Sequence, residues 1–226
     1  MIGRLTKRTL AHLPQTLQQE LKRWRFRHLI RKGQFIPQEP EMAVISRLLS
    51  QGSCAIDVGA NVGHYTCHMS KCVGPEGRVL AFEPLLDAFA LLTANVQAAA
   101  LNNVTLINAA ASSALAEVKM EVPKFDTGME NWYRAHIANT GRYSVLCFPL
   151  DAIPTVTPVS LIKIDAEGHD LQVLKGAENL IRTSKPTLIV EAPHDGEIAA
   201  WLAERGYKIT KADPQSPNIV ATWGGA

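Results

Sequence analysis

From residue 54 onward the chain alternates short, almost entirely apolar runs with stretches of helical periodicity. The apolar runs are CAIDV at 54–58, VLAFE at 79–83, VTLIN at 104–108, LIKID at 161–165 and TLIVE at 187–191. Strands that are apolar on both faces are typical of a parallel sheet whose two sides are covered by crossover helices. We therefore predict an α/β fold with a doubly wound, mostly parallel sheet.

The remaining patterns complete this expected domain. Helices are expected near 63–73, 85–100, 170–183 and 195–205, and antiparallel strands at 207–209 and 218–223 are expected to close one sheet edge. Two further alternating segments, 116–122 and 143–148, flank a polar loop of about twenty residues, a length that usually signals a functional or mobile loop.

The residues before this domain have a different character. Residues 13–31 read as an amphipathic helix, and a second helix is expected at 41–51. The net charge is only +2, yet residues 1–32 hold nine Lys and Arg against one Glu, so they carry +8 and the remainder carries −6. We predict a basic amphipathic helical arm at 1–34 and a single domain at 35–226.

Several roles for the arm stay open. Its apolar stripe can pack on its own domain, or residues 13–31 can contact an anionic membrane surface or another subunit. Nucleic acid is a further option, and it is the least favoured partner.

The sequence also indicates the compartment. It has neither the apolar core of a secretory signal nor an apolar run of the roughly 20 residues that a membrane span requires. We expect a cytoplasmic protein, with a peripheral position at the inner membrane surface as an option. The four cysteines form no CxxC pair, so a disulfide or zinc site is not expected.

Polar residues end each of the five predicted strands. Because ligands of open α/β sheets bind at the carboxyl ends of the strands, these residues are the first candidates for a site. They are Asp57, Glu83, Asn108, Asp165 and Glu191.

The turn after the first strand restricts which class of ligand the site can bind. It contains Gly59 and Gly63, but Asn61 stands where the dinucleotide fingerprint has glycine, and Asp57 would repel a pyrophosphate. A nicotinamide-dependent oxidoreductase is therefore disfavoured. An acidic turn suits a cationic ligand without phosphate, such as S-adenosylmethionine, although the glycines also fit close helix packing alone.

Two further strand ends fit the rest of that ligand. Glu83, 26 residues after Asp57, is placed to accept hydrogen bonds from ribose hydroxyls, and Asn108 and Ala109 to border adenine.

At this point the chain resembles a known family. The motifs are IDVGANVGHYT at 56–66, AFEP at 81–84, LIKIDAEGHD at 161–170, VLKGA at 173–177 and TLIVEAPH at 187–194. Together they resemble the FkbM family of S-adenosylmethionine-dependent methyltransferases over roughly residues 35–210. The resemblance implies a seven-stranded class I methyltransferase (Rossmann-like) fold and methyl transfer to a hydroxyl of a glycan, a lipid-linked sugar or a natural product.

The resemblance also assigns residues. It places the cofactor loop on Asp57, Gly59, Asn61 and Gly63, the ribose-binding acid on Glu83, and the fourth-strand motif on Asp165, Glu167, Gly168 and His169.

A general base is needed because a sugar hydroxyl is a weak nucleophile until its proton can leave. His169 is the preferred candidate, since an imidazole is half neutral near physiological pH. Glu167 or His194 is the alternative, and Asp165 should lie close to the methyl donor. His169 can also be a structural residue at the start of a helix. A divalent metal held by these acids and histidines is not favoured, because no dedicated ligand spacing is present.

Substrate contacts are expected in two places. The loop at 129–136 offers Trp132 and Tyr133, which suit stacking on a sugar face but also fit a surface loop packed on the domain. Glu191 and His194 end the fifth strand next to the fourth. Lys163 is expected to be a snorkelling or ion-paired side chain rather than a catalytic group. The function hypothesis is an O-methyltransferase, and the alternative is a catalytically silent module that recruits partners or lipid through the arm.

Overall fold

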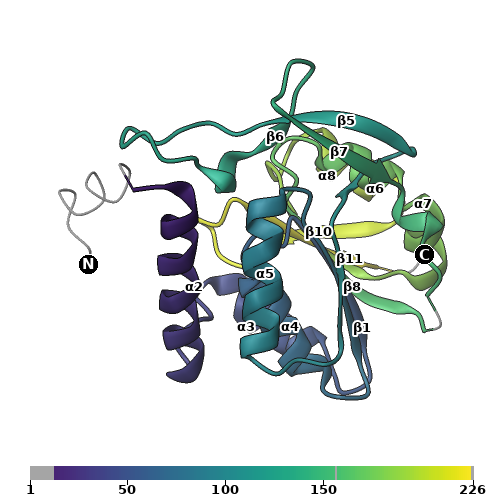
Figure 1. Cartoon of the computed structure of the whole chain (residues 1–226). Helices are drawn as coiled ribbons and strands as arrows, with labels where there is room; N and C mark the ends of the chain where they lie inside the picture. The colour runs from purple at the N-terminus through teal and green to yellow at the C-terminus, as the bar shows by residue number, and fades with distance from the viewer. Residues whose placement is uncertain (1–12, 156, 225–226) are drawn as a thin grey trace.

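The computed structural model describes residues 13–155 and 157–224 and is built around a seven-stranded sheet (Figure 1). The strand order across the sheet is β10-β11-β9-β8-β1-β2-β3. In chain order the strands are β1 (Cys54–Val58), β2 (Arg78–Phe82), β3 (Val104–Ile107), β8 (Val159–Ile164), β9 (Thr187–Glu191), β10 (Tyr207–Lys211) and β11 (Asn218–Trp223).

The sheet is mixed, so the expected mostly parallel arrangement is met only in part. Five neighbouring strands, from β9 to β3, pair in parallel, whereas β11 is antiparallel to both β9 and β10. The physical reason is the short 212–217 connection, which can join β10 to β11 as a hairpin but is too short for a parallel crossover.

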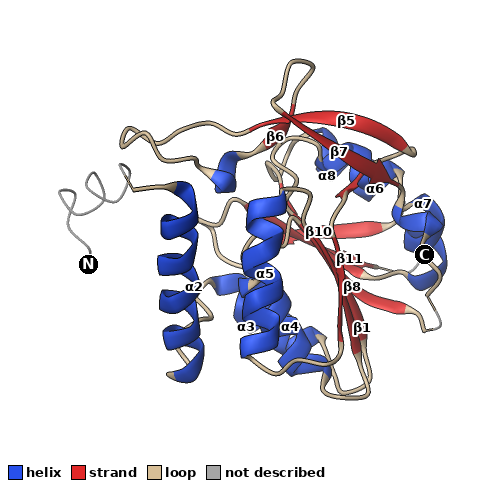
Figure 2. Cartoon of the chain, in the orientation of Figure 1, coloured by secondary structure: helices blue, strands red, loops and turns tan. Residues whose placement is uncertain are grey.

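Helices cover both faces of the sheet (Figure 2). They are α2 (Gln15–Arg31), α3 (Pro40–Leu48), α4 (His64–Val73), α5 (Leu86–Ala98), α6 (Asp170–Lys175), α7 (Glu178–Ser184) and α8 (Glu197–Ala203). Alternate strand residues face opposite ways: Ile56 and Leu80 pack with α6, α7 and α8, whereas Ala55 and Val79 pack with α3 and α4. This alternation explains why the strands are apolar almost throughout.

The single helix expected at 170–183 is wrong, because the chain breaks there into α6 and α7. The break lies at Gly176, where a Cβ atom would come within 1.9 Å of the Ser112 carbonyl oxygen. The second helix then has its own cap, since the Asp151 carboxylate accepts hydrogen bonds from the backbone N–H groups of Asn179 and Leu180.

A second, four-stranded sheet in the order β4-β7-β5-β6 forms between β3 and β8. It contains the two alternating segments identified in the sequence, which pair antiparallel as β5 and β7. Its elements are β4 (Ala110–Ala111), β5 (Ala116–Glu121), the short helix η1 (Trp132–Arg134), β6 (His136–Ile137), β7 (Tyr143–Phe148) and the short helix η2 (Leu150–Ala152).

The basic helix α2 packs against α5. Phe26, Leu29 and Ile30 join the apolar cluster beneath it, and the Gln19 amide donates to Asp87. Residues 1–12 of the expected arm lie outside the described residues. Within residues 13–155 and 157–224, no helix combines the length and the apolar character of a membrane span. The four cysteines are free.

Candidate active site

A cavity of about 740 Å³ opens at the carboxyl ends of the central strands. Most of the candidate residues identified in the sequence line it, although they come from segments up to 132 residues apart. They are Gly59, Asn61, Glu83, Ala109, Trp132, Tyr133, Asp165, Glu167, His169 and Glu191.

Five other candidates do not line the cavity, and one of them is Gly168 in the turn after β8. Asp57 is fully buried beneath it, and Gly63 caps α4. The Asn108 amide is turned away and donates to the backbone carbonyls of Glu83 and Pro84. His194 is exposed beyond the end of β9, so the structure does not bring it to the other candidates.

The turn after β1 requires glycine at its first position. Gly59 has a φ of 77°, and a Cβ atom there would lie 1.9 Å from the Asp165 backbone oxygen. The N–H groups of Gly59 and Ala60 both donate to the Phe82 carbonyl. This turn therefore lies directly against the ends of β2 and β8, and no other residue fits without moving the backbone.

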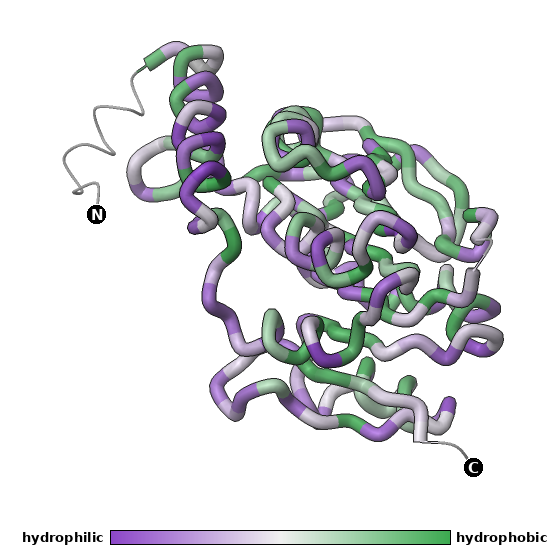
Figure 3. The backbone as a smooth tube through the Cα atoms, turned by 90° about the horizontal axis from the view of Figure 1, so that it is seen from below, coloured by the Kyte–Doolittle hydropathy of each residue, from purple (hydrophilic) through white to green (hydrophobic). Residues whose placement is uncertain are grey.

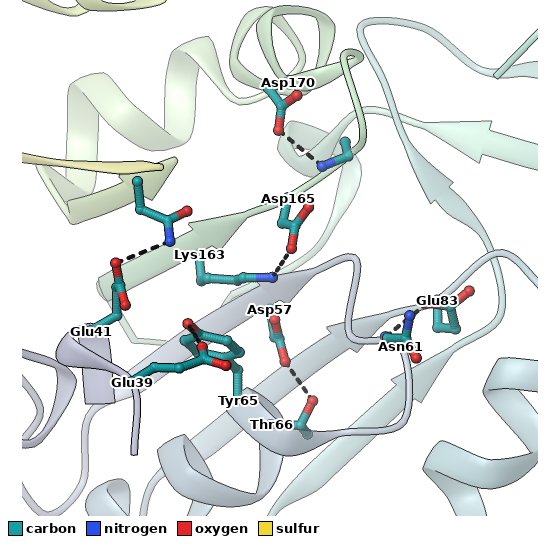
Figure 4. A network of polar contacts seen from close by, with 12 residues as sticks. Glu39, Glu41, Asp57, Asn61, Tyr65, Thr66, Glu83, Lys163, Asp165 and Asp170 are labelled. Atoms are coloured by element: carbon teal, nitrogen blue, oxygen red, sulfur yellow. Dashed lines mark hydrogen bonds and ion pairs between the residues drawn. The ribbon is translucent and has the colours of Figure 1, made fainter. Parts of the chain in front are cut away.

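Glu83 fixes the far side of the same turn. One of its carboxylate oxygens accepts a hydrogen bond from Asn61 N–H at 2.8 Å (Figure 4). The other oxygen accepts one from Leu85 N–H, also at 2.8 Å. Burial raises its pKa to about 7, although the two N–H donors oppose this shift. Each oxygen has a second lone pair, so the carboxylate can still accept a hydroxyl from a ligand in the cavity.

A buried ammonium group joins two of the strand-end acids. Lys163 is only 3% exposed, and its Nζ lies 3.0 Å from Asp165 Oδ2 and 4.8 Å from the centre of the Tyr65 ring. Its neighbour across the sheet is Asp57, whose Oδ2 accepts a hydrogen bond from the Thr66 hydroxyl (Figure 4). Burial opposes the charged ammonium, but Asp165 and Asp57 outweigh it and raise the pKa of Lys163. The expected ion pairing of Lys163 is confirmed.

The turn that follows β8 is held by the Asp170 carboxylate. Its two oxygens accept hydrogen bonds from the N–H groups of Ala166, at 2.9 Å, and Gly168, at 3.1 Å. Between them Glu167 has a left-handed backbone with φ of 49°, a conformation that non-glycine residues adopt only under constraint. Asp170, which was not among the sequence candidates, thus positions the DAEG turn.

His169 follows this turn and faces the cavity from the start of α6. Its Nε2 lies 2.8 Å from the Ser112 hydroxyl, and burial lowers the pKa of its imidazole. The ring is therefore neutral near physiological pH and can accept a proton.

Three carboxylates meet beside it. The side-chain oxygens of Asp165, Glu167 and Glu191 lie within 4.8 Å of one another. Burial and a hydrogen bond to Asp165 raise the pKa of Glu191 to about 7. Burial and the nearby Asp165 also raise the pKa of Glu167. Such a group can hold a cation or a proton.

The cavity has another wall, whose residues were not among the candidates identified in the sequence. The Tyr65 hydroxyl donates to Glu39, and the buried Glu41 accepts from an amide group, that of Asn218 (Figure 4). Glu41 also accepts from the Ser216 hydroxyl. No local pattern joins residues 41 and 216, so only the folded chain shows this wall. Tyr65, which is part of the GANVGHYT motif, was the one available signal.

The loop above the cavity is only partly free for a ligand. Lys22 Nζ lies 3.5 Å from the centre of the Trp132 ring, and the indole N–H donates to Glu130. One face of Trp132 is therefore covered by α2, whereas the Tyr133 side chain is more than half exposed. Of the two aromatic candidates, Tyr133 is the better placed for stacking.

Comparisons with known proteins agree with this geometry. The family described as the methyltransferase FkbM domain matches residues 57–209. The hexuronic acid methyltransferase AglP of Haloferax volcanii is 29% identical over 131 residues, which are 56% of this chain and 51% of AglP. The crystal structure of a methyltransferase FkbM from Methylobacillus flagellatus superposes with a TM-score of 0.56 and 20% identity, over 81% of this chain and 50% of that one. This chain thus spans about half the length of these two proteins.

Proposed function

The chain belongs to the FkbM methyltransferase family, and we propose that it transfers a methyl group from S-adenosylmethionine to a hydroxyl of a glycan, a lipid-linked sugar or a related natural product. One observation carries the proposal: Glu83, Asp165, His169 and the glycine turn after β1 all line the same cavity. The hexuronic acid substrate named for AglP supports a sugar as the acceptor.

The residues around the cavity fit this cofactor. Its volume of about 740 Å³ is ample for a ligand of that size. The amide oxygen of Asn61, on the glycine turn, is buried without a hydrogen-bond partner among the described residues. Glu83 would accept the ribose hydroxyls, Ala109 would border the adenine, and the acids at the ends of β8 and β9 would face the cationic end.

S-adenosylmethionine supplies an activated methyl group on a sulfonium. The protein must hold the acceptor oxygen in line with that group and receive the proton that the hydroxyl loses. Tyr133, which lines the cavity, would orient the acceptor together with the η1 loop. Lys163 holds Asp165 in position by the 3.0 Å ion pair.

Two groups are candidates for the proton acceptor. Glu191 is hydrogen-bonded to Asp165 and has a pKa of about 7, so it can take and release a proton near neutral pH. His169 is neutral near physiological pH, because burial lowers the pKa of its imidazole. We assign the base to the Asp165–Glu191 pair and keep His169 as the alternative. A metal ion at the three carboxylates would be a further alternative, which addition of a chelator tests directly.

Binding of S-adenosylhomocysteine, measured by isothermal titration, tests the cofactor assignment. We expect the intact chain to bind, and Glu83→Ala to weaken binding by tenfold or more, because a buried acceptor for two hydroxyls is lost. Glu76→Ala, on an exposed loop away from the cavity, is the matched control and should bind normally. A chain that does not bind would favour the catalytically silent module.

Methyl transfer is tested with methyl-labelled donor and uronic acid glycans, analysed by mass spectrometry. Glu191→Gln should abolish the pH dependence of turnover near pH 7 if the carboxyl pair is the base. If His169→Gln does so and Glu191→Gln does not, the assignment passes to His169.

A further inference from the structure

The helix α2 has two apolar faces, and only one of them is packed on the domain. Leu17, Leu21 and Trp24 recur at steps of four and three residues, and they are 45%, 41% and 69% exposed. They share one side of the helix, opposite Phe26 and Leu29, which pack on the α5 side. Figure 3 shows α2 at the edge of the molecule. The outward stripe is therefore not needed for the contact with α5.

Cations flank this stripe on both sides. At 100° per residue, Arg27 and Arg31 lie along one flank of Trp24, and Arg25 and Lys32 lie along the other. All four are exposed. The one acid of the helix, Glu20, is paired with Arg23 at 2.8 Å. The outward face is thus an apolar strip between two rows of positive charge.

This combination favours a lipid surface over a second protein. Leu and Trp between rows of Arg and Lys are typical of helices that lie in the interface of an anionic membrane, with apolar side chains in the acyl boundary and cations at the headgroups. The three apolar side chains expose on the order of 300 Å² together, well below the roughly 800 Å² that each partner buries in a stable protein interface.

The helix also adjoins the cavity. Lys22 lies on the Trp132 ring, and Phe26 meets the His64 ring edge-on at 6.1 Å between ring centres. Both Trp132 and His64 line the cavity. Lys22 and Phe26 lie on the inner side of α2, so a surface bound to its outer side would be separated from the cavity rim by the width of this one helix, about 10 Å.

We propose that the outward face of α2, formed by Leu17, Leu21 and Trp24 with their flanking cations, docks on membranes that contain anionic phospholipid. The docking stands on the surface of α2 alone. Its consequence for the reaction, that acceptors at the bilayer surface have preferential access to the cavity, rests on the proposed methyl transfer.

Vesicle co-sedimentation of the full chain tests the docking. The probes are phosphatidylcholine vesicles with and without about 30 mol% phosphatidylglycerol. We expect binding to the anionic vesicles to be at least roughly tenfold stronger, and to fall steeply at about 0.5 M salt. The triple variant Leu17→Ser/Leu21→Ser/Trp24→Ser should lose at least roughly tenfold in binding.

A matched control removes the same kinds of side chain elsewhere. Leu115, Leu146 and Trp223 are 75%, 60% and 42% exposed and lie on other elements, so Leu115→Ser/Leu146→Ser/Trp223→Ser should bind vesicles like the parent. S-adenosylhomocysteine binding, measured on each variant, verifies folding and separates a failure of docking from a failure of the proposed function.

Three results would overturn the docking. They are equal binding to neutral and anionic vesicles, unchanged binding in the α2 triple variant, and no vesicle binding at all. If light scattering instead finds a dimer that this variant disrupts, the occupant of the face is a second copy. Vesicle-independent RNA binding lost on the same substitutions would identify a nucleic acid.

Discussion

Substitution of Gly59 by alanine tests whether the turn after β1 is held by contact with β8. Gly59 and Gly52 both have left-handed backbones, with φ of 77° and 83°. A Cβ at Gly59 would lie 1.9 Å from the Asp165 carbonyl oxygen, whereas a Cβ at Gly52 would meet nothing within 4 Å. Gly52→Ala is therefore a matched control that has the backbone strain without the clash.

The magnitudes follow from these two contributions. A left-handed alanine costs about 1–2 kcal/mol at either position. The clash at Gly59 requires the neighbouring backbone to shift, which adds about 1–3 kcal/mol as in other overpacked sites. Gly59→Ala should therefore be about 2 kcal/mol less stable than Gly52→Ala, or roughly 4–8 °C lower in Tm for a chain of this size.

Thermal and urea unfolding of the two variants, measured in parallel, give the comparison. Since the shift moves the turn that lines the cavity, Gly59→Ala should also weaken S-adenosylhomocysteine binding, while Gly52→Ala should not. Equal losses of stability, within about 0.5 kcal/mol, would refute the inferred contact between the turn and Asp165.

Three further predictions concern the polar groups beneath and beside the cavity, and two of them have a control variant. Burial raises the Glu83 pKa from 4.5 to about 7. Between these pH values the folded chain binds a proton at Glu83 that the unfolded chain releases, so the free energy of unfolding should fall as the pH rises from 4.5 to 7. The free energy of unfolding, measured with urea at about pH 4.5 and 7.5, should fall between these two pH values by roughly 3 kcal/mol less in Glu83→Gln than in the parent. The same fall in both proteins would contradict this prediction. Asp170→Ala and Asp151→Ala each delete a carboxylate that accepts two backbone N–H groups, so both should lose about 1–3 kcal/mol. Of these two variants, only Asp170→Ala should also lower kcat for methyl transfer, because Asp170 positions the DAEG turn. Equal kcat values in the two variants would show that Asp170 does not have this positioning role. Lys163→Met leaves the buried Asp57 carboxylate and the partly exposed Asp165 carboxylate without their cation and should cost about 3–5 kcal/mol, whereas Lys175→Met on an exposed helix position should be nearly neutral in denaturant unfolding. A small loss for Lys163→Met would mean that the carboxylates take up protons instead.

The charge arrangement of the site has a common cause. Glu83 and Glu191 both have pKa values raised to about 7 by burial, and burial also raises the pKa of Asp57. A buried ammonium, Lys163, lies among the acids at the ends of β1 and β8. The site therefore contains ionisable groups whose charge changes near neutral pH. Such groups suit the binding of a cation and the removal of a proton from the hydroxyl that accepts the methyl group.

The local sequence determined most of the framework. Buried strands must be apolar on both faces, so their positions and the α/β class follow from periodicity alone. The strand ends follow as well, because the carboxyl ends of neighbouring parallel strands meet at one edge. That is why one cavity is lined by Glu83, Asp165 and Glu191, although they lie in separate segments of the sequence.

Only the tertiary structure decided which side chains meet across long separations. The Glu41 contact with Ser216, the break between α6 and α7 against Ser112, and the turning of Asn108 away from the cavity depend on neighbours that are distant in sequence. The same holds for α2, whose amphipathic pattern does not say which of its apolar sides packs on α5. Periodicity reports whether a residue is buried, but the identity of its neighbours is set by how the folded layers come together.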